Sequence, residues 1–252
     1  MGFSAAELSR DAFLGGRVEI LQPRSGYRAS TDPVLLAAAV AARPGQSALE
    51  LGCGAGVALL SLGCRVPDLQ LVGVERQVDY AELARLNAAE NGIPAVIWHA
   101  DLTRMPPELR TLRFDHVMAN PPFHPPTATP ASDPGRDGAL REATPLSLWI
   151  DAGLRRVNDG GYLTLIHRAE RLPEILSALQ GRVGAVAVRP LAARTGRAAG
   201  RVLVQARKGA RAPFRLLAPL ILHAGLSHTK DGDDFASEAR AILRDAAALD
   251  WN

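Results

Sequence analysis

The chain has 252 residues, of which 47% are hydrophobic, and its formal net charge is +3. This length and composition allow a buried core in one large or two small domains, and no apolar stretch approaches the roughly 18–20 residues that suggest a membrane span. The first residues include acids and lack the apolar segment of a signal peptide, so we expect none.

The cysteine pattern argues against a disulfide framework or a zinc site. Cys53 and Cys64 are the two cysteines, and neither belongs to a Cys-x-x-Cys pair or to a paired Cys/His spacing. We therefore expect no metal and a reducing, cytoplasmic location.

The N-terminal region predicts a hairpin followed by a helix. Residues 11–23 contain two short apolar runs on either side of a glycine pair, which suits a β-hairpin. Residues 30–42 begin with capping residues, have Pro33 in the first turn and continue as an apolar run, which predicts a helix. We expect a single domain over residues 1–252, with residues 1–46 as an extension of the core.

From residue 47 onward, strand and helix patterns alternate, which predicts βαβ units and a mostly parallel sheet covered on both faces. The runs that predict strands are residues 47–51, 69–75, 95–101, 113–120, 162–168, 184–191 and 201–209. The runs that predict helices are residues 57–66, 78–92, 147–161, 172–181 and 236–249. The last two strands have no helix between them, so we expect an antiparallel hairpin at one edge of the sheet.

Three glycines separate the first of these strands from its helix. Gly52, Gly54 and Gly56 allow the backbone to pass close under a ligand, and the helix start offers free N–H groups. In open α/β sheets this position is the ligand crevice. Val57 stands where the dinucleotide-binding pattern requires glycine or alanine, which disfavours NAD and a small-molecule dehydrogenase.

Acids follow at the ends of the next two strands. Glu75 comes 23 residues after Gly52, where a carboxylate can accept both ribose hydroxyls of an adenosine ligand. Asp101 ends the third strand and can accept a hydrogen bond from the adenine amino group. Either acid alone is compatible with a simple strand end. Because parallel strands end at one edge of the sheet, the glycines and both acids together predict an adenosine-binding site.

The fourth strand ends in "NPPF", residues 120–123. An exocyclic amino nitrogen is a poor nucleophile because its lone pair is delocalised into the ring. The Asn120 side-chain oxygen and the Pro121 carbonyl can accept its two N–H bonds, and Pro122 stiffens the turn. Phe123 offers a face on which a base stacks, worth ~1–3 kcal/mol. An ordinary turn after a strand is the alternative interpretation.

These motifs together resemble the class I S-adenosylmethionine-dependent methyltransferases over residues 28–210. "ELGCGAG" is similar to their first motif, with Glu50 near the methionine end of the cofactor, and Glu75 and Asp101 match the acids that bind its ribose and adenine. The resemblance implies a Rossmann-like sheet of seven strands with the last one antiparallel. It also implies S-adenosyl-L-methionine as cofactor and S-adenosyl-L-homocysteine as product.

"NPPF" resembles the (N/D)PP(Y/F) motif of the members that methylate a planar amino nitrogen. Residues 26–40 further resemble the tRNA1(Val) adenine-N6 methyltransferase family, whose motif has its Asp at the cofactor. Arg28, Thr31 and Asp32 match this motif, and the resemblance implies that these three residues, together with Asn120, bind the cofactor. It also implies methylation of adenosine N6 in tRNA. Ribosomal RNA guanine-N2 enzymes share "NPPFH" but typically carry a second, N-terminal copy of the domain, and glutamine-N5 enzymes usually have Tyr and a helical N-terminal domain. A non-catalytic RNA-binding module is the remaining alternative.

A basic tract without Asp or Glu runs from Ile175 to Lys230, as a polyanion-binding surface would. We expect Arg194, Arg197 and Arg201 in its loop and hairpin to contact RNA phosphates. A solvated surface is the alternative. Residues 123–145 are rich in Pro, Gly and polar residues, and we expect this loop to order over the substrate.

Overall fold

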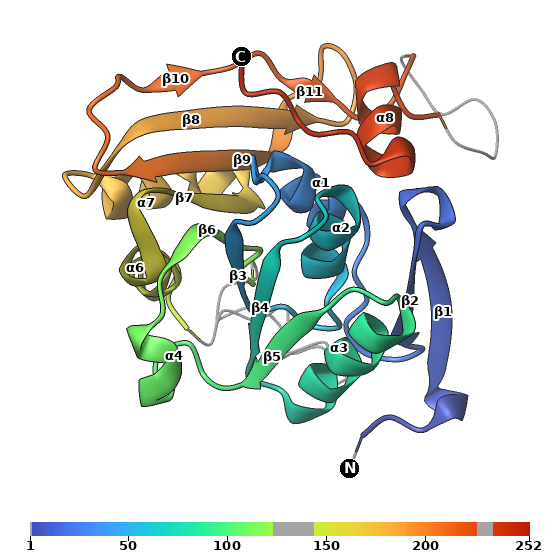
Figure 1. Ribbon diagram of the computed structural model, residues 1–252. Helices are drawn as coiled ribbons and strands as arrows, with labels where there is room; N and C mark the ends of the chain where they lie inside the picture. Colours follow the sequence, from blue (N-terminus) through green and yellow to red (C-terminus); the bar gives the residue numbers. More distant parts are fainter. Residues whose placement is uncertain (1, 123–143, 226–233) are drawn as a thin grey trace.

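A computed structural model describes residues 2–122, 144–225 and 234–252 and has one large sheet at its centre (Figure 1). The strand order is β5–β4–β3–β6–β7–β9–β8, and β10 and β11 pair with β8. The strands are β3 (Ser47–Leu51), β4 (Gln70–Glu75), β5 (Ala95–His99), β6 (Phe114–Ala119), β7 (Val157–Arg168), β8 (Val183–Ala192), β9 (Ala199–Lys208), β10 (Arg215–Leu216) and β11 (Leu220–Ile221).

Strand direction confirms the predicted Rossmann-like α/β class. The strands from β5 to β7 run parallel, and β9 is antiparallel to both of its neighbours, β7 and β8. The predicted antiparallel pairing of the last two long strands is therefore confirmed. The expectation that this hairpin forms the edge of the sheet is wrong, because β10 and β11 add two residues each along β8.

Helices cover both faces of the sheet (Figure 1). One face carries α1 (Thr31–Ala39), α2 (Val57–Arg65), α3 (Val78–Glu90) and α8 (Ser237–Asp245), and the other carries α4 (Pro107–Thr111), α6 (Leu146–Arg156) and α7 (Leu172–Leu179). None of the described helices is long and apolar enough to cross a membrane.

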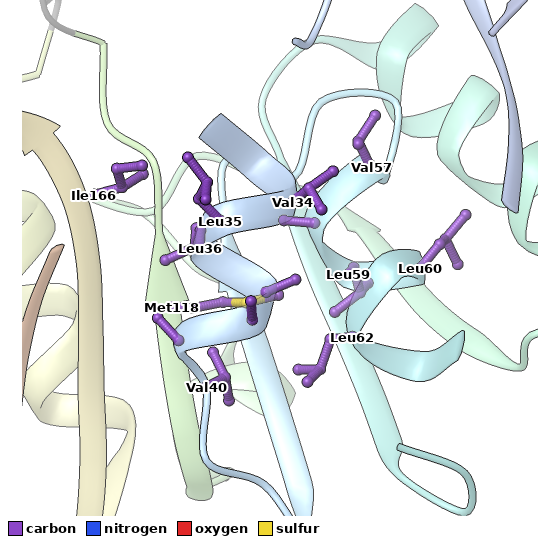
Figure 2. Close-up of a cluster of buried hydrophobic side chains, with 14 of the residues drawn as sticks. Val34, Leu35, Leu36, Val40, Val57, Leu59, Leu60, Leu62, Met118 and Ile166 are labelled. Carbon is purple, nitrogen blue, oxygen red and sulfur yellow. The ribbon is translucent and has the colours of Figure 1, made fainter. Parts of the chain in front are cut away.

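Alternate side chains of each strand enter different cores, as the period of two requires. Met118 of β6 and Ile166 of β7 pack with the leucines of α1 and α2 (Figure 2), whereas Val117 and Leu165 pack on the opposite side with α6. Glu50 pairs in register with Met118 and so lies on the α1–α2 side of β3. The sheet thus presents a buried carboxylate on that side.

The predicted N-terminal hairpin is confirmed as β1 (Leu8–Phe13) and β2 (Val18–Pro23). It forms a separate two-stranded sheet beside α2 and α3 (Figure 1). The side chain of Asn91, just after α3, accepts from Glu19 N (2.9 Å) and donates to Glu19 O (2.7 Å). The division of the domain at residue 46 stays a prediction.

The expected helix over residues 147–161 is wrong at its C-terminal end. α6 stops at Arg156, and β7 begins at Val157. Phe114 pairs with Val157 but His116 pairs with Tyr162, so extra residues of β7 bulge between these pairs. Gly161 permits this packing, because a Cβ there would lie 2.7 Å from the Asp115 carbonyl oxygen. The glycines that suggest a helix end therefore belong to a strand bulge.

α8 also ends earlier than expected, at Asp245.

The fold should lose stability in mild acid through His116. This β6 side chain is 2% exposed, and burial lowers its pKa to about 4, with Arg65 adding to the shift and Asp115 opposing it. An unfolded histidine binds a proton near pH 6.5, as a general value. The folded chain resists protonation down to the lower pKa. The free energy of unfolding should therefore fall by about 2 kcal/mol more between pH 7 and pH 5 than it does without this residue.

Urea unfolding of the protein and of His116→Phe at both pH values tests this. Phenylalanine can keep the stacking on Tyr162, whose ring centroid lies 5.7 Å from that of His116, but it cannot titrate. The same pH dependence in both proteins would exclude His116 as the cause.

Candidate functional site

A pocket opens where β3, β4, β5 and β6 end, and it brings together most of the residues singled out from the sequence. Its lining includes the predicted residues Glu50, Gly52, Gly54, Glu75, Asp101, Asn120 and Pro122. Gly56 caps α2 next to Val57, which lines the pocket, and Pro121 is buried between two lining residues. Phe123 and most of the predicted substrate loop lie outside the described residues.

The loop between β3 and α2 follows the end of β4 closely. Gly52, Gly54 and Gly56 have φ of +69°, +53° and +91°, a conformation that glycine adopts without the steric cost of a side chain. The amides of Gly52 and Cys53 donate to the Val74 carbonyl oxygen at 2.7 and 3.0 Å. The loop backbone is therefore fastened to the neighbouring strand while its other side faces the pocket.

Glu75 fastens the same loop. Its Oε2 accepts from the Gly54 amide at 2.9 Å, and its Oε1 accepts from the Gln77 amide at 2.8 Å. Burial raises the pKa of Glu75 above its ordinary value, although these N–H groups and Arg76 favour the charged form. Each carboxylate oxygen has two lone pairs, so the group can accept hydrogen bonds from a ligand without releasing the loop.

Asp101 lies beyond the end of β5, which stops at His99. The amide and the hydroxyl of Thr103 both donate to its Oδ1, each at 2.7 Å. Burial acts to raise the pKa of Asp101, but these bonds and the charges of Arg76 and Arg104 outweigh it, and the pKa lies below its ordinary value. Asp101 is therefore an ionised acceptor at the rim of the pocket.

The sequence of this chain is similar to those of known methyltransferases. Residues 30–133 match the family model of the methyltransferase small domain. A tRNA1(Val) (adenine(37)-N6)-methyltransferase of Porphyromonas gingivalis is 33% identical over 174 residues, which cover 66% of this chain and 68% of that protein. This chain belongs to the class I S-adenosylmethionine-dependent methyltransferases.

Solved structures share the fold of this methyltransferase. A protein of Agrobacterium tumefaciens described as a predicted O-methyltransferase has a TM-score of 0.68 at 28% identity, covering 86% of this chain and 98% of its own. The T. thermophilus 16S rRNA N2 G1207 methyltransferase, solved with AdoMet and guanosine, has a TM-score of 0.54 at 21% identity, covering 80% of this chain and 50% of its own.

The pocket of the methyltransferase fits the cofactor of its class, S-adenosylmethionine. Glu50 is 3% exposed, and its Oε2 is buried without a hydrogen-bond partner in the described residues. Burial raises its pKa well above the ordinary value, and the charge of Glu75 adds to the shift. An unpartnered carboxyl oxygen in a pocket wall can hydrogen-bond to a polar group of a ligand.

The N-terminal region contributes a wall that the sequence did not predict. Gln22, Tyr27, Ala29 and Pro33 line the pocket. The Tyr80 hydroxyl holds the Tyr27 backbone, accepting from its amide (2.9 Å) and donating to its carbonyl (3.2 Å). Burial raises the pKa of Tyr27, and the charges of Asp32 and Glu50 add to this, so its hydroxyl stays protonated. The aromatic residue directly before Arg28 was the available signal.

The three residues of the N-terminal motif that were expected at the cofactor, Arg28, Thr31 and Asp32, are not among those that line the pocket. Arg28 pairs with Asp11 of β1 at 2.5 Å. Asp32 pairs through its Oδ2 with Arg201 Nε of β9 at 2.7 Å. These side chains hold the hairpin and α1 in place, and a direct contact of theirs with the cofactor stays a prediction.

The basic tract has no acids in its own sequence, but the fold brings acids from other segments next to it. Several of its cations pair with acids from other parts of the chain: Arg182 with Asp151, Arg189 with Glu238, Arg194 with Asp234, Arg201 with Asp32, and Lys208 with Asp159. Of the three arginines expected to contact RNA, Arg197 is exposed and has no acidic partner in the described residues, whereas Arg194 and Arg201 are engaged within the chain.

Alanine substitution should lower the free energy of unfolding more at Gly52 than at Gly54. A Cβ on Gly52 would lie 2.6 Å from the Trp149 ring, whereas the nearest atom to one on Gly54 is 4.0 Å away. Both substitutions strain a positive φ, which costs roughly 1–2 kcal/mol. Gly52→Ala should lose a further 1–3 kcal/mol, roughly, by overpacking. Urea unfolding measures the difference, and equal losses for the two variants would contradict the close Trp149 contact.

Proposed function

We propose that this methyltransferase transfers a methyl group to N6 of an adenosine in tRNA. The observation that carries the proposal is the Asn-Pro-Pro turn after β6, which puts Asn120 and Pro122 in the wall of the pocket that also contains the glycine loop and Asp101. The P. gingivalis relative supports it, because its name describes N6 methylation of adenine in a tRNA.

The cofactor supplies an electrophilic methyl group on a positively charged sulfur, and the chain's residues orient it. In the proposed arrangement, Glu75 accepts from the ribose hydroxyls and Asp101 accepts from the adenine amino group through Oδ2, since its Oδ1 already takes both Thr103 bonds. Glu50, whose Oε2 has no partner in the described residues, would accept or donate a hydrogen bond at the amino-acid end of the cofactor. The backbone of Gly52, Gly54 and Gly56 passes beneath.

The acceptor nitrogen is held by oxygen atoms. The Asn120 side-chain oxygen and the Pro121 carbonyl accept its two N–H bonds, which directs the nitrogen lone pair toward the methyl group. Asn120 lines the pocket, where a bound substrate can contact its amide. Pro121 and Pro122 have no N–H and restrict the backbone, which keeps this carbonyl fixed. Phe123 supplies the stacking face. Catalysis then depends on positioning and fixed dipoles rather than on a strong base.

The competing acceptors differ in how many N–H or O–H bonds they offer. A hydroxyl, the acceptor of an O-methyltransferase, donates one bond and leaves one of the two oxygens unused. Guanine N2 donates two, like adenine N6, so the turn alone does not separate them. The T. thermophilus neighbour solved with guanosine makes guanine N2 in ribosomal RNA the second candidate. A glutamine side-chain amide and a non-catalytic RNA-binding role are the others.

The identity of the labelled product separates these candidates. Purified enzyme is incubated with tritiated S-adenosylmethionine and either total tRNA, ribosomal RNA or cell protein, and the RNA is then digested to nucleosides for mass spectrometry. The proposal expects N6-methyladenosine from tRNA, and the same nucleoside should be missing from tRNA of a deletion strain. Label in N2-methylguanosine or in protein would replace the proposal with the corresponding alternative. If the protein bound no cofactor, the non-catalytic RNA-binding role would be the alternative that remains.

Asn120→Ala should abolish transfer while leaving the cofactor bound. The loss of one fixed acceptor should lower kcat by about 10²–10³-fold, and the Kd for S-adenosylmethionine should stay within about twofold. Asn158→Ala is the matched control. The Nδ2 of this asparagine donates to Asp115 Oδ1 at 3.2 Å near the starts of β7 and β6, at the end of the strands opposite to the pocket. Full activity of Asn120→Ala would disprove the mechanism.

Arg197→Ala should weaken tRNA binding without loss of stability. One phosphate contact removed lowers the slope of log affinity against log salt by about one unit. Arg194→Ala and Arg201→Ala should also lower the free energy of unfolding, because each breaks an ion pair within the chain. Filter binding of tRNA at several salt concentrations, with thermal unfolding of each variant, measures both effects. An unchanged slope in Arg197→Ala would remove this residue from the RNA surface.

A further inference from the structure

Asn87 connects two parts of the chain that both form the cofactor pocket. It lies on α3 and is 0% exposed. Its Oδ1 accepts from the Leu21 amide (2.8 Å), and its Nδ2 donates to the Leu21 carbonyl (3.0 Å). The same Nδ2 also donates to the carbonyl of Ala55 in the glycine loop, at 2.9 Å. Both N–H donors and the side-chain oxygen of one buried amide thus bond to β2 or to that loop.

Both contacts reach the pocket lining or a residue adjacent to it in the chain. Ala55 itself lines the pocket. Leu21 precedes Gln22, another lining residue, whose Oε1 accepts from the amide of Ala29 in the same wall at 2.7 Å. Asn87 therefore sets the separation between the glycine loop and the N-terminal wall of the pocket.

The Ala55 carbonyl takes its hydrogen bond from outside the loop, from Asn87. Gly56 follows with φ of +91°, and glycine backbones rotate at low steric cost. The Gly56 amide donates to the Cys53 carbonyl at 2.8 Å, and the Ala55 carbonyl, on the other side of the same peptide, bonds to Asn87. Without the Asn87 amide, a buried carbonyl loses its partner. This peptide would then rotate, carrying a carbonyl oxygen toward the pocket.

We propose that Asn87 is a positioning residue of the cofactor site, which fixes the Ala55–Gly56 peptide and the Leu21 backbone in the arrangement that binds S-adenosylmethionine. It need not touch the cofactor. Its effect passes through the glycine loop, so it should change cofactor affinity and not only the stability of the fold.

Asn91 provides a matched control. It lies one helical turn further along, and its amide makes the same paired contact with β2, accepting from Glu19 N and donating to Glu19 O. Among the residues that the structure describes, its side chain bonds to Glu19 and to the Asn87 carbonyl and not to the glycine loop, and it does not line the pocket. Asn91→Ala therefore loosens the hairpin without releasing the Ala55 carbonyl.

The experiment measures the Kd for S-adenosylmethionine by calorimetry in the full chain, in Asn87→Ala and in Asn91→Ala, with the melting temperature of each. Both variants should melt at a lower temperature. Asn87→Ala should raise the Kd at least tenfold and speed hydrogen exchange at the Gly56 amide. Asn91→Ala should keep the Kd within twofold and leave that exchange rate unchanged. No RNA is needed, so failure of the proposed acceptor would not affect the result.

Asn87→Asp provides a second variant should Asn87→Ala not fold. It keeps the size of the side chain and can still accept from the Leu21 amide, but even when protonated it has a single donor for the Leu21 and Ala55 carbonyls, so its Kd should also rise at least tenfold. An unchanged Kd in whichever Asn87 variant folds, or an equal rise in Asn91→Ala, would show that Asn87 only stabilises the fold.

Discussion

The cofactor pocket depends on a loop that cannot hold its own conformation. Gly52, Gly54 and Gly56 all have positive φ. Because glycine loses more conformational entropy on folding than any other residue, this loop is costly to order. Its shape comes from its neighbours: the Val74 carbonyl and the Glu75 carboxylate fasten it to β4. The end of a strand therefore serves both as a brace and as part of the pocket wall. This explains why a carboxylate as buried as Glu75 is held by backbone N–H groups.

Charge balance in this chain is a property of the fold and not of any one segment. The long tract without acids meets carboxylates supplied by α1, α6, β7, α8 and the segment just before α8, so much of its positive charge is compensated. The most exposed of these pairs, Lys208 with Asp159, contributes little stability. The larger effect of the pairs is to leave fewer cations available to a polyanion than a count along the sequence suggests.

The periodicity of apolar residues along the chain predicted most of the strands and helices. The elements that it missed depend on contacts between distant segments. Residues 47–51 were predicted as a strand, and β3 has these same bounds, because an apolar run of that length between turns is typical of a buried parallel strand. The two-residue strands β10 and β11 have no such period, and their pairing with β8 depends on tertiary contact. The glycines at residues 160 and 161 resemble a helix end, and only the register with β6 shows the bulge.

The site was predictable where a motif places its residues at strand ends, as for Glu75, Asp101 and Asn120. The wall around Tyr27 was not, since it is set by Tyr80, 53 residues away, just as Leu21 is held by Asn87, 66 residues away. The aromatic residue before Arg28 marks Tyr27 as a candidate, but a single sequence does not show that Tyr80 or Asn87 is its neighbour or that of Leu21.

The pairing of Asn91 with the hairpin also bears on the chemical durability of the protein. An asparagine followed by glycine is the dipeptide most prone to cyclise and lose ammonia, when the glycine nitrogen attacks the side-chain carbonyl. Here the Gly92 amide donates to the Ala89 carbonyl (3.1 Å), and the Asn91 side chain is held by Glu19. The bonds that dock the hairpin therefore also keep the two reacting groups occupied, and ageing at this dipeptide is slowed for as long as β2 stays in place.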